Sequence, residues 1–302
     1  MIKRTVEVSS DALYLHVRNR QLVLKSRDGT ERMIPSEDIG MLVLDNPGIT
    51  LTTAVINVIT STGGCIVVCN PSHLPQGLVL PIEGNSLQSE RFQKQVSMPE
   101  PLRKQIWKML VQAKLNLQAK LLESLGKQHQ MVSSLSKQVK SGDKGNLEAQ
   151  GARIYWNELF GRDFKRDRYG DGPNALLNYG YTILRASVAR SLCGSGLHPT
   201  LGVHHHHRNN AFCLADDLME PFRPLVDQAV YRIWVTGKTT IDRESKSELL
   251  GLHNNYVFMK NQNQMVQIAI QLTSQSLAKS IMEGHEDLCL PESPAYEASE
   301  SA

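Results

Sequence analysis

The chain has 302 residues, 41% of them hydrophobic and 21% charged, which is typical of a globular protein whose core is large enough for two domains. No apolar run approaches the roughly 20 residues that cross a bilayer, and the first residues lack a hydrophobic signal core. Membrane-spanning and secreted classes are therefore excluded, and the sequence predicts a cytoplasmic protein.

The formal net charge is only +3, but it is unevenly distributed. Six of the 30 acidic residues, and no Lys or Arg, fall within 283–302. The remaining 282 residues carry a formal charge of +9, which favours a polyanionic partner. The five cysteines are odd in number and lie on scattered apolar stretches, so a disulfide framework is not expected.

Residues 1–85 are predicted to form a small β-rich domain. Short apolar runs alternate with turn residues such as Asp28-Gly29, and helical spacing over 50–62 is ended by Gly63 and Gly64. Pro81 places the last strand at a sheet edge. The predicted strands span 13–17, 21–25, 32–34, 40–44, 65–69 and 77–82.

From residue 86 the hydrophobic period becomes helical, and residues 86–283 are predicted to form a larger, all-helical catalytic domain. The fold class is therefore α+β. The acidic, Ser-rich segment 284–302 is expected to be disordered. Beyond an apolar stripe over 106–125, the predicted helices span 142–160, 174–193, 214–234 and 262–282.

Carboxylates on these helices are candidate metal ligands. Glu148 lies beside the apolar face of its helix, where burial costs several kcal/mol unless the group is paired, protonated or bound to metal. Pairing with Arg153 or another Arg is the structural alternative. Asp217 and Glu220 are spaced i, i+3 and share a helix face, although charge at a helix N-terminus also explains acids there.

Two prolines and four histidines flank these carboxylates. Pro221 and Pro224 predict that the helix over 214–234 is either kinked or begins late. The histidines at 204–207 alternate in direction if the segment is extended, so they cannot all bind one ion. Hard oxygen ligands favour Mg²⁺ or Mn²⁺, and an imidazole among them favours Mn²⁺. Such an ion in a basic chain indicates phosphodiester chemistry.

Three further stretches match one family. They are Asn174-x-x-x-Asn178-Tyr-Gly-Tyr181, Leu197-His-Pro-Thr-Leu-Gly202 and the run from Ala211 to Pro224. With the histidines and Glu148, these motifs make the chain resemble the CRISPR-associated integrase of spacer-acquisition complexes, in particular its type II branch. The resemblance covers nearly the whole chain, and it implies a prokaryotic protein.

The resemblance also implies roles for individual residues. The metal ligands would be Glu148, His205 and Glu220, since the family histidine lies 15 residues before the Glu in the type II pattern. His204 is the runner-up, because it directly follows Val203. Asp217 matches a further acid of the family site and would assist.

The implied reaction is the attack of the 3′-hydroxyl of a short DNA duplex on a phosphodiester at the edge of a CRISPR repeat. It needs no nucleophile from the enzyme. The implied partners are double-stranded DNA, a second copy of the chain bound through the β-rich domain, and a small CRISPR-associated companion subunit that joins two such dimers.

Basic residues near the candidate site are expected to contact DNA phosphates. The alternative is that Asp163, Asp167 and Asp171 neutralise the loop that carries most of them. The DNA-binding candidates are Arg153, Arg162, Lys165, Arg166, Arg168 and Arg223.

Two other functions remain open at this point. A metal-dependent nuclease that cuts DNA without joining it would use the same site, because water and a 3′-hydroxyl are similar nucleophiles. A non-catalytic DNA-binding scaffold would use the carboxylates only for structure.

Overall fold

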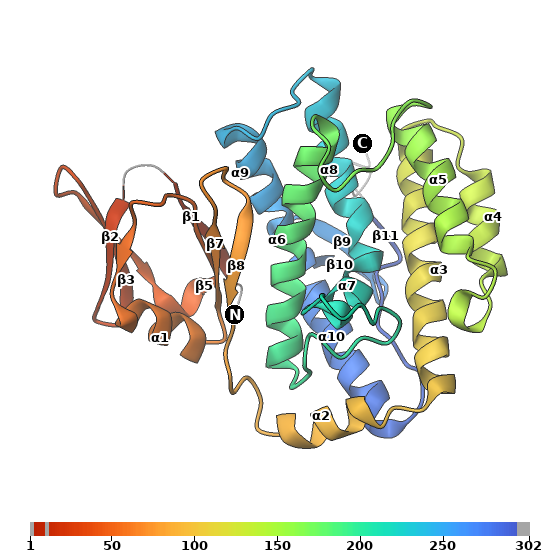
Figure 1. Cartoon of the computed structure of the whole chain (residues 1–302), viewed down its shortest axis with the longest axis horizontal. Helices are drawn as coiled ribbons and strands as arrows, with labels where there is room; N and C mark the ends of the chain where they lie inside the picture. Colours follow the sequence, from red (N-terminus) through yellow and green to blue (C-terminus); the bar gives the residue numbers. More distant parts are fainter. Residues whose placement is uncertain (1–2, 10–11, 295–302) are drawn as a thin grey trace, which may run out of the picture.

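A computed structural model describes residues 3–9 and 12–294 of the chain. Figure 1 shows a β-rich part at one end and a larger helical part at the other, as the sequence predicts, so the α+β fold class is confirmed. The strands of the β-rich part are β1 (Arg4–Val8), β2 (Ala12–Arg18), β3 (Gln21–Ser26), β4 (Glu31–Pro35), β5 (Ile39–Leu44), β6 (Thr50–Leu51), β7 (Cys65–Cys69) and β8 (Pro75–Val79).

These strands form two four-stranded sheets with the helix α1 (Thr53–Ser61) packed against them. One sheet has the order β4-β3-β2-β6, and the other has the order β1-β5-β7-β8, with β8 at its edge as predicted. In the second sheet β5 pairs in parallel with both β1 and β7, and β8 is antiparallel to β7.

The sheet β1-β5-β7-β8 is buried on both faces. Leu42 and Ile66 face the core of the β-rich part, whereas Met41, Val43 and Cys65 pack into the core of the helical part. This explains why β5 and β7 are continuous apolar runs rather than alternating ones. The two parts of the molecule therefore share this sheet as a common wall.

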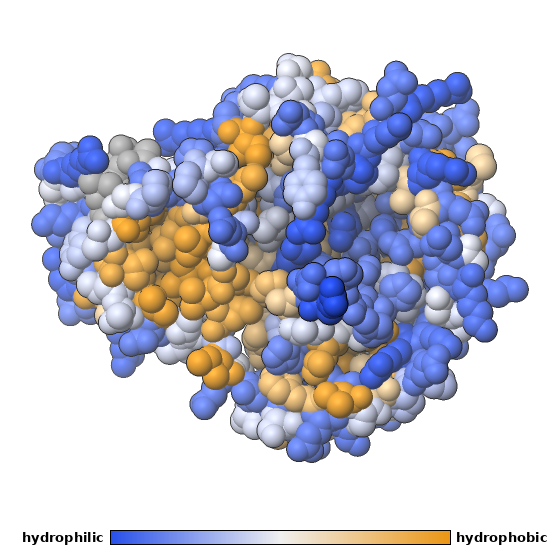
Figure 2. Space-filling view, viewed as in Figure 1, coloured by the Kyte–Doolittle hydropathy of each residue, from blue (hydrophilic) through white to orange (hydrophobic). Residues whose placement is uncertain are grey.

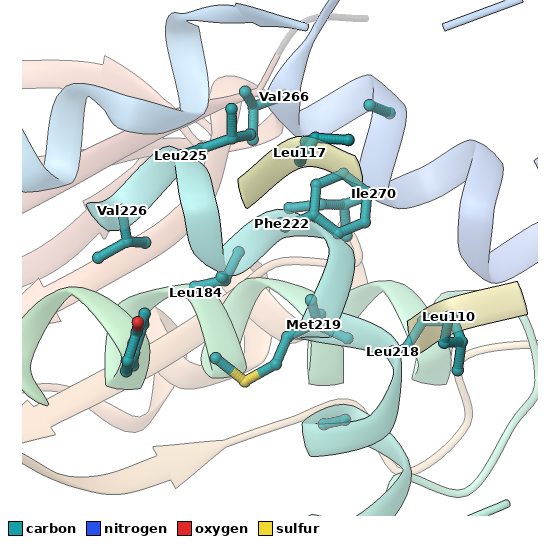
Figure 3. Packing of buried hydrophobic residues seen from close by; sticks show 14 of the residues in the cluster. Leu110, Leu117, Leu184, Leu218, Met219, Phe222, Leu225, Val226, Val266 and Ile270 are labelled. Carbon is teal, nitrogen blue, oxygen red and sulfur yellow. The ribbon is translucent and has the colours of Figure 1, made fainter. Parts of the chain in front are cut away.

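The helical part is built around one long helix, α3 (Glu100–Ser124), whose buried stripe includes Ile106, Leu110 and Leu117. Figure 3 shows Leu110 and Leu117 packed with residues from α6 and α10 around the turn that carries Phe222. The other helices are α2 (Gln88–Val96), α4 (Gln130–Gln138), α5 (Leu147–Phe160), α6 (Pro173–Gly194), α7 (Cys213–Met219), α8 (Arg223–Val235), α9 (Arg243–Gly251) and α10 (Val266–Glu283).

The expectation of an all-helical second domain is wrong in one place. Strands β9 (Tyr256–Met259), β10 (Gln262–Met265) and β11 (Ser293–Pro294) form a small antiparallel sheet in the order β10-β9-β11. Lys260 and Asn261 have φ values of 51° and 59°, as a tight two-residue hairpin turn requires. The helix predicted from residue 262 therefore begins at Val266.

The expectation of a disordered segment from residue 284 is also wrong as far as residue 294. The backbone oxygen of Cys289 accepts a hydrogen bond from Thr273 Oγ1 at 2.7 Å, and the backbone oxygen of Glu292 accepts one from Lys120 Nζ at 2.8 Å. The side chain of Cys289 is buried. Residues 284–294, called the tail segment below, thus pack on α3 and α10, and residues 295–302 lie outside the described part.

Two further features of the described structure are the length of its helices and the distribution of hydrophobic residues on its surface. Across the part of the chain that the structure describes, no helix is both long and apolar enough to cross a membrane. Figure 2 shows hydrophobic residues gathered over the β-rich part on the face that it displays. Large exposed hydrophobic side chains of this part and of the connection to α2 include Met33, Val68 and Ile82.

Candidate active site

The predicted helix over 214–234 is broken where its prolines lie. α7 ends at Met219, the 3-10 turn Glu220–Phe222 follows, and α8 begins at Arg223. Pro221 and Pro224 each occupy the first turn of the segment that follows the break, where proline's missing N–H costs little. Of the two predicted outcomes, a kinked helix or a helix that begins late, the structure shows a kink at Glu220.

This break is fixed in the core by apolar neighbours. Leu218, Met219 and Phe222 are buried on either side of Glu220, and Figure 3 shows them packed between α3, α6 and α10. Because its neighbours anchor the turn, Glu220 is held inside the protein at 3% exposure. A buried carboxylate needs compensating charge, and the structure supplies it from two side chains.

Those two side chains are Lys114 and Arg223. Lys114 Nζ lies 2.6 Å from Glu220 Oε2, and Arg223 Nε lies 3.0 Å from Glu220 Oε1. Burial alone would raise the pKa of the Glu220 carboxyl, but the charges of Arg223 and Lys114 lower it below its usual value. Glu220 is therefore held as a carboxylate.

Glu148 reaches the same ammonium group from another helix. Its Oε1 lies 2.6 Å from Lys114 Nζ. Burial alone would lower the pKa of Lys114, but the charges of Glu220 and Glu148 raise it. Lys114 on α3 therefore lies as a buried cation between two carboxylates that are 72 residues apart in the chain. The expected alternative partner of Glu148, Arg153, is exposed.

The position of Glu148 follows from how α5 begins. The sequence predicts that this helix starts at Gly142, but it starts at Leu147. The reason is that Asp143 and Asn146 both have positive φ. The Asp143 carboxylate accepts hydrogen bonds from the backbone N–H groups of Leu147 and Glu148, at 2.9 and 3.0 Å. This cap fixes Glu148 in the first turn.

α5 also lies very close to α3. A β-carbon added to Gly151 would approach Leu115 Cδ2 to 2.3 Å. A side chain at this crossing would therefore displace Leu115 or separate the helices, and the close approach allows Glu148 to reach Lys114.

The histidine run is organised by Asp217, which is fully buried. Asp217 accepts hydrogen bonds from the backbone N–H groups of Val203, His204 and His205, at 2.7, 3.0 and 3.2 Å. It also bonds His205 Nδ1 at 2.6 Å, and this bond raises the pKa of the His205 imidazole. The carboxylate therefore shapes the loop and fixes the direction of one ring.

The four histidines differ clearly in their surroundings. The His204 ring stacks on Trp107 with centroids 4.1 Å apart and planes 2° apart, and burial lowers the pKa of this imidazole. His206 and His207 are exposed. His205 alone has one ring nitrogen fixed by a buried carboxylate, which leaves Nε2 as the atom available to a ligand.

The donor set fits a divalent ion, although the side chains as they lie do not enclose one. Within the described residues, no three His, Cys, Asp or Glu side chains stand in a ligating arrangement. Glu148 and Glu220 nevertheless point their oxygens at one cationic atom. A histidine oriented by a carboxylate is the usual companion of such oxygens at a metal centre. Asp217 acts on His205 and the loop.

The predicted DNA-binding residues fall into three groups. Arg153, Arg162, Lys165 and Arg168 are exposed, and among the described residues no carboxylate lies within ion-pair distance of them. Arg223 forms an ion pair with Glu220. Arg166 donates hydrogen bonds to Asn174 Oδ1 at 3.0 Å and Asn178 Oδ1 at 2.6 Å. These bonds tie residues 161–172, called the basic loop below, to α6, so Arg166 anchors the loop.

One important residue was missed by the sequence reasoning. Lys114 lies four residues after Leu110 and three before Leu117, on the apolar stripe of α3. A lysine on such a stripe is rarely buried without a partner. That position was the available signal for an acidic cluster facing α3.

Comparison with known proteins decides the family. The family model described as "CRISPR associated protein Cas1" matches residues 6–264. The chain belongs to the Cas1 family. The resemblance stated from the sequence is thus confirmed, and the similarity to a Neisseria relative fits the type II branch.

Curated Cas1 relatives show the extent of this similarity. The chain is 35% identical over 226 residues to the CRISPR-associated endonuclease Cas1 of Neisseria meningitidis serogroup C, with 74% of each chain covered. It is 27% identical over 243 residues to a CRISPR-associated endonuclease Cas1 of Pyrobaculum aerophilum, covering 76% of this chain and 82% of the relative.

Solved structures share the fold. A casposase bound to integration product matches with a TM-score of 0.80 and 21% identity, covering 99% of this chain and 96% of the other. A CAS1 protein from Thermotoga maritima matches with a TM-score of 0.75 and 17% identity, covering 97% and 100%. In a Cas6-RT-Cas1–Cas2 complex the TM-score is 0.72 at 18% identity, and the match covers 94% of this chain and 36% of that longer chain.

Proposed function

We propose that this Cas1-family chain is a metal-dependent DNA endonuclease and integrase of CRISPR adaptation. It joins the 3′-hydroxyl ends of short duplex DNA into the edges of CRISPR repeats. The observation that carries the proposal is the convergence of Glu148 and Glu220 on one buried cation, Lys114, beside a histidine fixed by Asp217. Curated relatives named endonucleases support the nuclease part.

Glu148, Glu220 and His205 Nε2 would hold Mg²⁺ or Mn²⁺. When bound, the ion polarises the phosphate and stabilises charge on the attacking and leaving oxygens. Lys114 and Arg223 keep Glu220 ionised, and Asp217 keeps the His205 ring turned so that Nε2 is free.

The chain itself supplies no nucleophile. In strand transfer the 3′-hydroxyl oxygen forms a new P–O bond as the bond to the leaving 3′-oxygen breaks, and the hydroxyl proton passes to that leaving oxygen. Bond types and charge are conserved, so no energy source is required. Arg162, Lys165 and Arg168 on the basic loop are free to hold the DNA backbone during this exchange.

Assembly follows from the same proposal. The hydrophobic residues that Figure 2 shows over the β-rich part would suit contact with a second copy of the chain. A small companion subunit then joins two such dimers. Known structures of the family named as a Cas1–Cas2 complex and a Cas1–DNA complex support a companion and DNA as partners.

A strand-transfer assay tests the proposal. Short duplex donor, supercoiled plasmid containing a repeat, the companion subunit and Mn²⁺ are combined with the wild type, Glu148→Gln or Glu220→Gln. Both variants should lose integration. Gln is chosen at 220 because Ala would remove the polar partner of Arg223 and one of the two polar partners of Lys114. Integration by either folded variant at the wild-type rate would remove that carboxylate from the reaction.

The same assay separates the nuclease alternative, which the relatives' names favour. A nuclease without joining activity would nick the plasmid but leave the labelled donor free. Covalent transfer of the donor label into plasmid is therefore the decisive product.

A further inference from the structure

A buried carboxylate outside the proposed metal site connects α6 with α5 and α8, the helices that carry Glu148 and Arg223. Asp227 on α8 is fully buried. Its Oδ2 accepts a hydrogen bond from the Tyr155 hydroxyl of α5 at 2.8 Å, and its Oδ1 accepts one from the Tyr181 hydroxyl of α6. Asp227 has no role in the proposed reaction, so this cluster of Asp227, Tyr155 and Tyr181 needs its own explanation.

The ring of Tyr181 faces two guanidinium groups. Arg223 Cζ lies 4.8 Å from the ring centroid, and Arg166 Cζ lies 5.3 Å from it. Both distances lie within the roughly 6 Å at which a cation is attracted to an aromatic face. Arg166 anchors the basic loop, and Arg223 contacts Glu220, so one ring lies between the DNA-facing loop and the site.

Spacing along the helices makes these contacts consequential. Asp227 lies four residues after Arg223 on the same face of α8, and Tyr155 lies seven residues after Glu148 on α5. The cluster therefore fixes the rotation and depth of the two helices at the points from which Arg223 and Glu148 reach the site.

A purely structural role for the cluster would explain the hydrogen bonds to Asp227. It would not explain why the residue at position 181 is aromatic. An apolar side chain at 181 would fill the space, whereas only an aromatic ring gives the Arg223 guanidinium an attractive face. The Arg223 side chain is partly exposed, at 26%, but its partner Glu220 is buried, and next to a buried carboxylate small displacements of the guanidinium change the charge felt by that carboxylate.

We propose that Tyr181, held by Asp227, is a positioning residue that fixes Arg223 against Glu220. It touches neither substrate nor metal, and it acts through the face of its ring. This inference rests on the proposed function for its kinetic consequence, but its physical core is a coupling between Tyr181 and Arg223 that exists without DNA or metal.

A double-mutant cycle on the full chain tests that coupling. Stability is measured by urea unfolding for the wild type, Tyr181→Met, Arg223→Met and the double variant, without divalent ions. The two changes should be non-additive, with a coupling of about two- to thirty-fold in the unfolding equilibrium constant. The matched cycle with Tyr181→Phe, which keeps the ring and loses only the hydroxyl, should be additive with Arg223→Met within twofold.

Additivity in the Met cycle overturns the proposal. Equal coupling in the Phe cycle also overturns it, because the effect would then run through the hydroxyl. Tyr181→Leu is measured in parallel, so that a folding failure of one apolar variant does not prevent the comparison.

Kinetics then separate positioning from packing. In Mn²⁺-dependent DNA cleavage, Tyr181→Met should lower kcat about tenfold with the KM for DNA within twofold, because Asn174 and Asn178 still hold the basic loop. Tyr181→Phe should keep most of kcat. A normal kcat in Tyr181→Met would reduce the ring to a packing contact. Absence of any cleavage by the wild type would instead refute the proposed function, and the cycle would still decide the coupling.

Discussion

At the scale of single residues, Lys114 accounts for how the buried carboxylate of Glu220 and the partly buried carboxylate of Glu148 lie close together. Its ammonium group lies within ion-pair distance of both Glu148 and Glu220. Breaking a buried pair by removing one partner costs about 3–5 kcal/mol, because the remaining charge is uncompensated. A divalent ion between the same oxygens would offset that loss, so metal and lysine charge are alternative means of stabilisation.

This reasoning gives a stability prediction for Lys114→Met. In EDTA the variant should unfold at a lower temperature than the wild type. Added Mn²⁺ should raise its Tm by more than it raises that of the wild type, since no ammonium group competes. At 100 times the dissociation constant the gain is about 2.7 kcal/mol. Calorimetry with and without Mn²⁺ measures both effects.

Lys108→Met is the matched control, because Lys108 lies on the same helix without an ion pair among the described residues. Its Tm should respond to Mn²⁺ as the wild type does. Identical Mn²⁺ shifts in wild type and Lys114→Met would contradict the placement of the ion between Glu148 and Glu220.

The histidine run yields a ranked prediction. His205→Ala should reduce Mn²⁺-dependent cleavage at least tenfold, because a ligand oriented by Asp217 is lost. His206→Ala and His207→Ala remove exposed rings and should stay within twofold. His204→Ala removes the stack on Trp107 and should lower stability more than activity. Initial rates and Tm values for the four variants give the order, and inactivity of His204→Ala alone would move the ligand by one position.

At the scale of helices and strands, the sequence predicts elements best where hydrophobic spacing is long and regular. The stripe of α3 and the apolar runs of β5 and β7 were identified correctly. Breaks were missed where a few polar residues carry unusual backbone angles, as at Asp143 and Asn146 before α5. A positive φ cannot be predicted from an Asp or an Asn alone, because both residue types also occur with ordinary helical backbone angles.

The candidate site was predictable only in part for a related reason. Glu148, His205 and Glu220 lie on segments whose local sequence is distinctive. Their common neighbour Lys114 belongs to a helix that looks like ordinary core, and its role depends on the crossing of α3 and α5 at Gly151. Contacts between distant segments of this kind leave little trace in local spacing.

The cluster around Asp227 predicts a pH dependence of stability. Burial raises the pKa of the Asp227 carboxyl to about 6, above the ordinary value of 3.8, although Tyr181 and Tyr155 partly oppose this. Folding therefore takes up a proton between these two values, and the Asp227 contribution to the free energy of unfolding falls as pH rises through about 6. The difference corresponds to about 3 kcal/mol.

Asp227→Asn should remove this contribution. Urea unfolding of wild type and variant at pH values from 4 to 8 measures it as the difference between the two curves. The wild type should lose stability relative to the variant as pH rises from 4 to 7. A constant difference across that range would show that Asp227 does not titrate there.

The tail segment predicts a sharp boundary for truncation. Ending the chain after Pro294 should leave stability unchanged within about 0.5 kcal/mol. Ending it after Glu286 removes buried Cys289, the hydrogen bond that Thr273 Oγ1 donates to the backbone oxygen of Cys289, and strand β11. That shorter chain should lose about 2–4 kcal/mol, by analogy with the loss of other well-packed buried groups. Urea unfolding of both truncations measures the difference, and equal stability would show that residues 287–294 do not hold the fold.

At the scale of the whole molecule, the β-rich and helical parts are joined by a shared sheet and by a buried ion pair. Lys246 Nζ on α9 lies 2.5 Å from Asp45 Oδ2, directly after β5. Met41 and Val43 of β5 pack against the helical core on the same wall. The proposed dimer surface and the proposed active site are therefore held in a fixed relation within one chain.

That geometry predicts how salt and the companion subunit act on DNA. The logarithm of DNA affinity should fall linearly with the logarithm of salt concentration, because phosphate contacts release counterions. Replacing Arg162, Lys165 and Arg168 together by Ala should make the slope shallower by about 2 to 3. Lys279→Ala should leave it unchanged, because Glu283 and Asp287 already offset that charge.

Integration at two repeat edges should further require the companion subunit. In the proposed assembly one dimer would hold its two sites at a separation set by the fold, whereas two dimers on a bridge would place a site at each end of the donor. The chain alone should nick supercoiled plasmid and give single-ended products, and added companion should turn these into paired integrations at repeat edges. Sequencing of the products measures the change. Paired integration of equal accuracy by the chain alone would remove the bridge from the proposal and leave the chemistry of Glu148, His205 and Glu220 unaffected.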